Sequence, residues 1–162
     1  MENEQFQDIR RILIPLDGST LSENALKYGI SIANKFGAEI VLVSVYASKE
    51  PDSLLKKRLE EMDPNLGKEV EKMHPLYLIE NYHTILKNAL AKKKISIKSV
   101  LRDANISTDS VINVLLDLVK KENIDLVVIS SHGKSGFRKL KLGSVTEELI
   151  KALMIPVLCV KK

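Results

Sequence analysis

The sequence predicts an open α/β sheet of five parallel strands with helices on both faces. Short aliphatic runs alternate with longer segments whose apolar residues recur at the helical period, along most of the 162 residues. The apolar residues are mostly aliphatic, with 4% aromatic residues and no tryptophan, as is typical of strands buried on both faces of a parallel sheet. The length suits one domain, residues 1–162, with a single buried core.

The first part of the chain predicts two strands joined by a helix. Residues 11–16 carry large aliphatic side chains and predict the first strand. Apolar residues at the helical period predict a helix at 20–36, with Thr20 as its N-cap and Glu23 at capping-box spacing. The nearly continuous apolar run at 39–45 predicts a second strand, buried on both faces.

A charged stretch separates the second strand from the third. Residues 49–73 contain prolines and many charges, so we expect a surface excursion, with one short helix at 54–61 and no function that the residues reveal. A second packed helix is predicted at 76–90 from its apolar periodicity. The alternation at 95–101 predicts a third strand near an edge of the sheet.

The last third of the chain predicts two more helix–strand pairs. They are a helix at 108–119 capped by Ser107 or Thr108, a strand at 124–130, a helix at 144–153 and a strand at 156–160. Ser144 and Glu147 have capping-box spacing at the start of the second helix. Strands that alternate with helices in this way predict right-handed crossovers and parallel pairing.

Charge and composition narrow the class of partner. The net charge is +4, but Lys and Arg mostly alternate with acids, as on solvated helix faces, so we expect no nucleic-acid binding. The N-terminal residues are polar and acidic, and no apolar run approaches the length of a membrane span, so we expect no export and no membrane insertion. The single cysteine, Cys159, cannot form an intramolecular disulfide, which favours the cytoplasm.

One loop, at 130–144, has the parts of an anion-binding site. Its glycines let backbone amides approach a ligand, and the hydroxyls of Ser131, Ser144 and Thr146 can donate hydrogen bonds. The helix that begins at Ser144 adds free N–H groups and the positive end of its dipole. If the first and fourth strands are neighbours, Asp17 lies beside this loop. The alternative is a plain turn with solvated lysines.

Other motifs do not support a catalytic or metal site. The Gly-Lys-Ser at 133–135 resembles the end of a P-loop, but Val128 stands where that motif needs a glycine. No G-x-G-x-x-G follows a strand, which argues against NAD. The three histidines are scattered, so no metal site is expected. His132 has no assignable partner and Cys159 lies in a strand as an inert thiol, so we assign no catalytic residue.

The loop also resembles a family motif. The ATP-binding branch of the universal stress protein family carries a glycine, two residues, a glycine, nine residues, then glycine and Ser or Thr. Here Ser130 replaces the first glycine, whereas Gly133, Gly143 and Ser144 match. The opening segment at 14–19 is also similar, and the resemblance covers nearly the whole chain. It implies a Rossmann-like fold of the nucleotide-binding α-hydrolase-like type.

The resemblance further implies a ligand, a partner and a role. The ligand would be ATP, or ADP or AMP, and Mg²⁺ could accompany the bound nucleotide. The chain would form a homodimer through 156–160 and act in the stress response, together with an unknown protein partner. The implied nucleotide contacts are Asp17, Val45, Ser130, Ser131, His132, Gly133, Gly143, Ser144, Val145 and Thr146.

Two alternatives stay open. Ser130 places a side chain where the family has a glycine, which lowers the expected affinity and favours a nucleotide-free dimeric interaction module as a competitor. A slow Mg²⁺-dependent ATPase is the other alternative, with weak hydrolysis rather than dedicated turnover. His132 and Asp17 are its only candidate water-positioning residues.

Overall fold

A parallel sheet organises the chain. The computed structural model describes residues 8–46, 61, 84, 95–103, 108–133 and 142–161. Within these ranges, five parallel strands form one sheet in the order β3-β2-β1-β4-β5. The strands are β1 (Arg11–Pro15), β2 (Glu39–Tyr46), β3 (Ile97–Asp103), β4 (Leu126–Ser130) and β5 (Val157–Val160). The predicted open five-stranded parallel sheet is confirmed.

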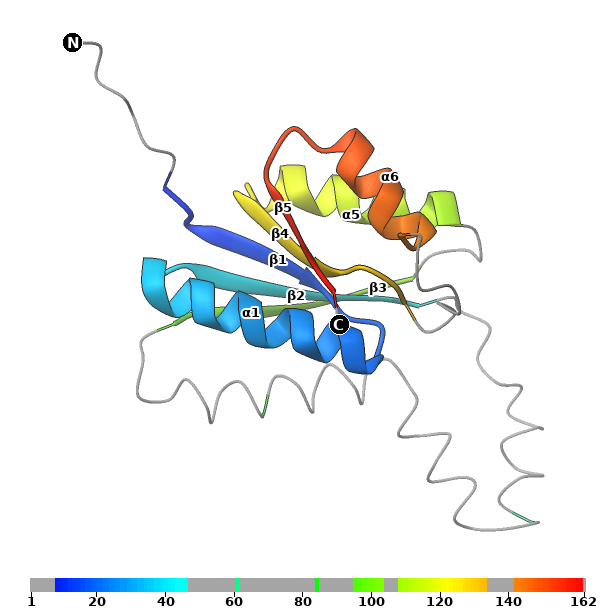
Figure 1. The fold of residues 1–162 in the computed structure, drawn as a ribbon, viewed down its shortest axis with the longest axis horizontal. Helices are drawn as coiled ribbons and strands as arrows, with labels where there is room; N and C mark the ends of the chain where they lie inside the picture. Colours follow the sequence, from blue (N-terminus) through cyan, green and yellow to red (C-terminus); the bar gives the residue numbers. More distant parts are fainter. Residues whose placement is uncertain are drawn as a thin grey trace.

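Helices cover both faces of the sheet. Helix α1 (Thr20–Phe36) lies on one side, and α5 (Thr108–Lys121) and α6 (Ser144–Ala152) lie on the other (Figure 1). Strand β1 lies between β2 and β4, so the chain winds outward in one direction up to β3 and in the other up to β5. The winding reverses between β1 and β4, which creates a crevice at the carboxyl ends of these strands.

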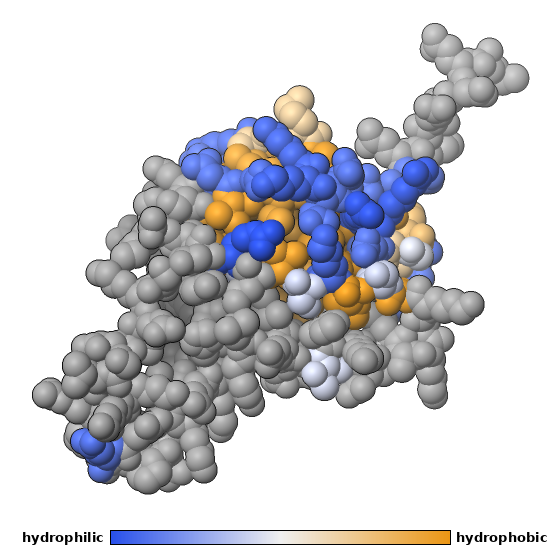
Figure 2. All heavy atoms as spheres, turned by 180° about the vertical axis from the view of Figure 1, so that it is seen from behind, coloured by the Kyte–Doolittle hydropathy of each residue, from blue (hydrophilic) through white to orange (hydrophobic). Residues whose placement is uncertain are grey.

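The apolar residues form a core on each side of the sheet. Along β1, Ile12 and Ile14 pack in the α1 layer, whereas Leu13 packs in the layer of α5 and α6. Every residue of β4 is buried, as expected for a central strand covered on both faces. Seen from the side opposite to Figure 1, the described surface shows apolar patches among polar residues (Figure 2).

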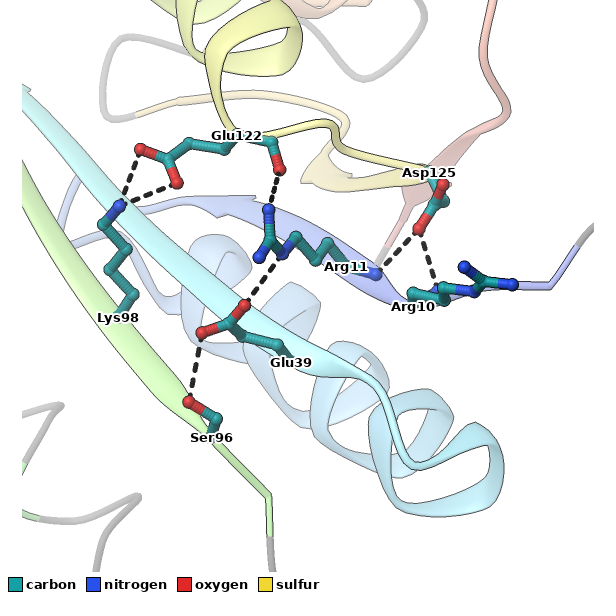
Figure 3. Close-up of polar contacts among 7 residues, drawn as sticks. All are labelled: Arg10, Arg11, Glu39, Ser96, Lys98, Glu122 and Asp125. Carbon is teal, nitrogen blue, oxygen red and sulfur yellow. Dashed lines mark hydrogen bonds and ion pairs between the residues drawn. The ribbon is translucent and has the colours of Figure 1, made fainter.

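Polar contacts join the amino ends of the strands (Figure 3). The Arg11 guanidinium donates to Glu39 Oε2 at 2.9 Å and to the Glu122 carbonyl at 2.8 Å. The Asp125 carboxylate accepts the backbone N–H groups of Arg10 and Arg11 at 2.8 and 2.9 Å. These side chains therefore organise the amino ends of the strands, and the carboxyl ends are left to form the crevice.

The predicted elements agree closely with the structure, apart from their ends. The strand predicted at 124–130 begins at Leu126, because the Asp125 side chain turns back to the start of β1. The helix predicted to end at residue 119 continues to Lys121. The strand predicted near an edge is β3, which is an edge strand. The predicted excursion at 49–73 and helices at 54–61 and 76–90 lie outside the described residues, except for positions 61 and 84.

Two predicted helix caps are wrong. Helix α1 is capped by Ser19 and not by Thr20, because Ser19 has the extended backbone of a cap and its Oγ accepts the Ser22 N–H at 3.1 Å. Helix α6 is capped by Gly143 and not by Ser144, so no side chain closes its N-terminus. Among the described helices, none is both long and apolar enough to cross a membrane.

Candidate functional site

A cavity of about 170 Å³ lies at the carboxyl ends of the central strands. It is bounded by β1, β2 and β4, by the first two turns of α5 and by the first turn of α6, and it lies where the winding of the sheet reverses. Its lining residues are Pro15, Leu16, Asp17, Val43, Val45, Val111, Leu115, Ile129, Ser130, Gly133, Gly143, Ser144, Val145 and Thr146.

One wall of the cavity is aliphatic. Val43 and Val45 come from the same face of β2, and Ile129 comes from β4. Val111 and Leu115 stand one turn apart on α5 and complete this wall. An apolar wall with a few polar groups at one end is typical of small-molecule sites, where the polar groups fix the orientation of the ligand.

Asp17 contributes a carboxylate at the end of β1. Its Oδ1 accepts the Ser19 N–H at 2.9 Å, which orients the carboxylate at the start of α1. A Cβ atom built on Gly133 would lie 2.8 Å from Asp17 Oδ2. A side chain at 133 would therefore displace the Asp17 carboxylate from its observed position. Strands β1 and β4 are neighbours, which is the condition under which the sequence analysis expects Asp17 beside this loop, and this pairing brings Asp17 next to Gly133.

Gly143 positions the start of α6 against the end of β4. Its N–H donates to the Ser131 carbonyl at 2.8 Å, and a Cβ atom built on it would lie 3.4 Å from His132 Cα. The Gly143 carbonyl accepts the Glu147 N–H at 2.9 Å, which is a first intrahelical bond. The N–H groups of the first helical residues, 144–146, therefore have no acceptor within the helix. They present partial positive charge to the cavity.

Two of the predicted contact residues lie outside the cavity lining. Ser131 is buried, and its N–H donates to the Val160 carbonyl of β5 at 2.8 Å. Its Oγ lies 2.9 Å from His132 Nδ1. His132 Nε2 is buried, and no group in the described part of the chain hydrogen-bonds to it. The other predicted contacts line the cavity, from Asp17 and Val45 to the residues of the loop and of α6.

Several lining residues were missed by the sequence analysis. They are Pro15, Leu16, Val43, Val111, Leu115 and Ile129. The strand residues among them could have been found from alternation, because Val43 shares a face of its strand with Val45. The helix residues Val111 and Leu115 could not have been found from the sequence, because the orientation of α5 over the sheet depends on tertiary packing.

The described part of the site offers little acid–base chemistry. Within the described ranges, no group of three or more His, Cys, Asp or Glu side chains is arranged to hold a metal ion. Cys159, on β5, is half-buried, and this burial raises the pKa of its thiol. The arrangement is therefore suited to holding a ligand with one apolar part and one anionic part.

The sequence matches known proteins along nearly its whole length. The model of the universal stress protein family matches residues 8–161. Universal stress protein MJ0577 of Methanocaldococcus jannaschii is 32% identical over 163 residues, which cover 94% of this chain and 95% of that protein. Universal stress protein MJ0531 of the same organism is 30% identical over 161 residues, which cover 94% of this chain and 82% of that protein.

Solved structures show the same fold. The structure of MJ0577 has a TM-score of 0.65 at 26% identity and covers 96% of this chain and 98% of its own. A universal stress protein in complex with cAMP has a TM-score of 0.60 at 21% identity, with 95% and 98% covered. A family member from Arabidopsis thaliana with AMP bound has a TM-score of 0.59 at 17% identity, with 94% and 92% covered.

Proposed function

The chain belongs to the universal stress protein family, and we propose that it binds an adenine nucleotide in the cavity at the carboxyl edge of its sheet. The ligand would be ATP, ADP or AMP. The protein would act as a dimeric regulator of the stress response, in which the bound nucleotide biases conformation or partner choice.

One observation carries this proposal: an aliphatic wall and an uncapped helix N-terminus face the same cavity. The wall at Val45 and Leu115 would hold the adenine ring. The N–H groups at 144–146 would receive a phosphate, because they combine free donors with the positive end of the helix dipole. The carboxylate of Asp17 would accept a hydrogen bond from the nucleoside. With ATP, Mg²⁺ would be held largely by phosphate oxygens and water.

The close packing around Gly133 and Gly143 also supports an adenine nucleotide as the ligand. Gly133 leaves room for Asp17, and Gly143 lets the start of α6 approach the end of β4. Side chains at these positions would displace Asp17 or separate α6 from the end of β4, and would thereby disturb the groups that are proposed to contact the ligand. The AMP and cAMP named for two solved members of the family are the same class of ligand. Both carry an adenine ring and a single phosphate.

Dimerisation through 156–160 is part of the same proposal. Strand β5 stands at the end of the strand order, and in the described structure it pairs only with β4. Leu158 on this strand is 37% exposed, and Met154 just before it is 99% exposed. Antiparallel pairing of β5 with a copy of itself would cover these side chains and remove an open edge. A cytoplasmic location, expected from the lone cysteine, completes the proposal.

The direct test is to identify what the purified protein carries. Small molecules are released from fresh protein and identified by mass spectrometry, and the emptied protein is titrated with ATP, ADP and AMP, with and without Mg²⁺, by calorimetry. Co-purified or saturable adenine nucleotide is expected. Folded protein that binds none of the three would overturn the proposal in favour of a nucleotide-free interaction module. Sustained release of ADP from ATP would instead show an enzyme.

A further inference from the structure

Two hydrogen bonds join the end of β4 to the start of α6. The Gly143 N–H donates to the Ser131 carbonyl at 2.8 Å. The Thr146 hydroxyl donates to the Ser130 carbonyl, also at 2.8 Å. Thr146 is 3% exposed, so water does not compete effectively for this bond. Two successive carbonyls, those of Ser130 at the end of β4 and of the next residue, therefore hold the N-cap and the first turn of α6.

The Ser130 carbonyl needs such a donor because of its direction. Within a peptide unit, the C=O and N–H groups point in opposite directions. The Ser131 N–H donates to Val160 of β5, so the Ser130 carbonyl points away from β5, toward the side of β1. The paired residues of β1 and β4 end at Leu13 and Val127. The carbonyl thus lies beyond the ladder, and a buried carbonyl without a donor is costly.

From this geometry we propose that Thr146 is a positioning residue for the phosphate of the ligand, which rests on the nucleotide-binding function proposed above. Its hydroxyl proton is committed to Ser130, so its role is to fix the orientation of α6 relative to β4. The N–H groups of Ser144 and Val145 then point at one place in the cavity. Pre-aligned donors bind an anion more tightly than donors that must be ordered during binding.

A positioning role for Thr146 predicts that its loss lowers the affinity only of ligands that carry a phosphate. Adenosine contacts only the aliphatic wall and the Asp17 end of the cavity, whereas AMP also uses the first turn of α6. Loss of the Thr146 hydroxyl should therefore weaken AMP and spare adenosine. General destabilisation of the fold would weaken both ligands together.

The test compares the affinities of AMP and adenosine, measured by calorimetry, in four proteins. They are the wild type, Thr146→Val, Thr146→Ser and Val127→Ala. Valine keeps the shape of threonine without the hydroxyl, and serine keeps the hydroxyl. Val127 is fully buried in the same strand and does not line the cavity, so its truncation is a control for lowered stability.

Thr146→Val is expected to lose about tenfold in AMP affinity and less than about twofold in adenosine affinity. Thr146→Ser and Val127→Ala should keep the wild-type ratio of the two affinities. Should Thr146→Val fail to fold, Thr146→Ala replaces it, with the same expectation. Equal losses for both ligands, or no loss, would overturn the positioning role while leaving the nucleotide site in place. Wild-type protein that binds neither ligand would overturn the proposed function itself.

Discussion

Gly133 faces the carboxylate of Asp17 so closely that a Cβ atom at 133 would lie 2.8 Å from Oδ2. The other carboxylate oxygen accepts the Ser19 N–H at 2.9 Å, so the side chain cannot turn away without losing that bond. The described positive-φ residues do not include Gly133, so space and not backbone conformation explains this glycine. The residue that follows β1 and the chain after β4 are thus in close contact where both line the cavity.

Replacing Gly133 by alanine should weaken nucleotide binding by displacing the Asp17 carboxylate. A double-mutant cycle with Asp17→Ala measures this by calorimetry with AMP. Gly133→Ala is expected to lower affinity in the wild type and to have little further effect once Asp17 is alanine, because the two substitutions then act through one group. Fully additive losses would show that the methyl group acts on the ligand and not through Asp17.

Gly143→Val should abolish nucleotide binding and leave the fold and the dimer intact. A Cβ at 143 meets backbone atoms of His132 and Ser131 at 3.4 and 3.5 Å, and the added methyl groups of valine would push the start of α6 away from the loop. Gly143→Ala, whose contacts are close to ordinary van der Waals distances, is the milder comparison. Calorimetry and light scattering provide the two readouts, and unchanged affinity in the valine variant would remove Gly143 from the site.

Ser130→Gly should tighten nucleotide binding and slightly destabilise the protein. Ser130 lines the cavity while only 6% exposed, so removing its side chain enlarges the space near the ligand. A glycine within a strand costs about 0.5–1 kcal/mol in free energy of unfolding. Calorimetry and chemical unfolding test the two effects separately. Unchanged or weaker binding would refute crowding by this side chain.

Gly29→Ala should lower the free energy of unfolding, because overpacking a core usually costs about 1–3 kcal/mol. A Cβ at 29 would overlap Ile14 Cδ1, because α1 packs closely on β1 at this point. The gain in helix propensity of about 1 kcal/mol offsets part of that cost, so the expected net loss is up to about 2 kcal/mol. Ile14→Val removes Cδ1, so the double variant should recover much of the loss. Urea unfolding provides the measurement, and a stabilised Gly29→Ala variant would contradict this packing.

Leu158→Lys should convert the proposed dimer to a monomer. A lysine on an open strand edge opposes pairing with another edge, and Leu158, at 37% exposure, is the most exposed residue of β5. Tyr28→Lys is the matched control, because Tyr28 is also a large exposed side chain but lies on α1. Light scattering should show a monomer only for the first variant. A dimeric Leu158→Lys protein would place the interface elsewhere.

The parallel direction of the strands could be predicted, because the alternation of strands and helices is a local pattern, whereas their order in the sheet depends on tertiary packing. The continuous aliphatic run that became β2 and the alternation that became β3 predicted a central and an edge strand, as observed. Helix caps were less predictable. Ser19 and Thr20 are adjacent hydroxyl residues, and only the extended backbone of Ser19 (φ −82°, ψ 153°) decides between them.

The site was only partly predictable for a similar reason. The glycine spacing identified the loop, and the fold brought Asp17 beside it. The bond between Thr146 and Ser130 spans sixteen residues and depends on where α6 packs, so no local pattern indicates it. No local pattern indicates the position of His132 either. It lies outside the cavity lining, although its neighbour Gly133 lies within it.

The most direct measurement is a two-dimensional amide NMR titration of the emptied protein with AMP. It reports on each backbone N–H group separately. Saturable shifts are expected at Gly133, Ser144, Val145 and Thr146, with smaller changes at the amino ends of the strands near Arg11. Saturable binding that leaves the amides of α6 unshifted, or no binding at all, would contradict the phosphate site at the start of this helix.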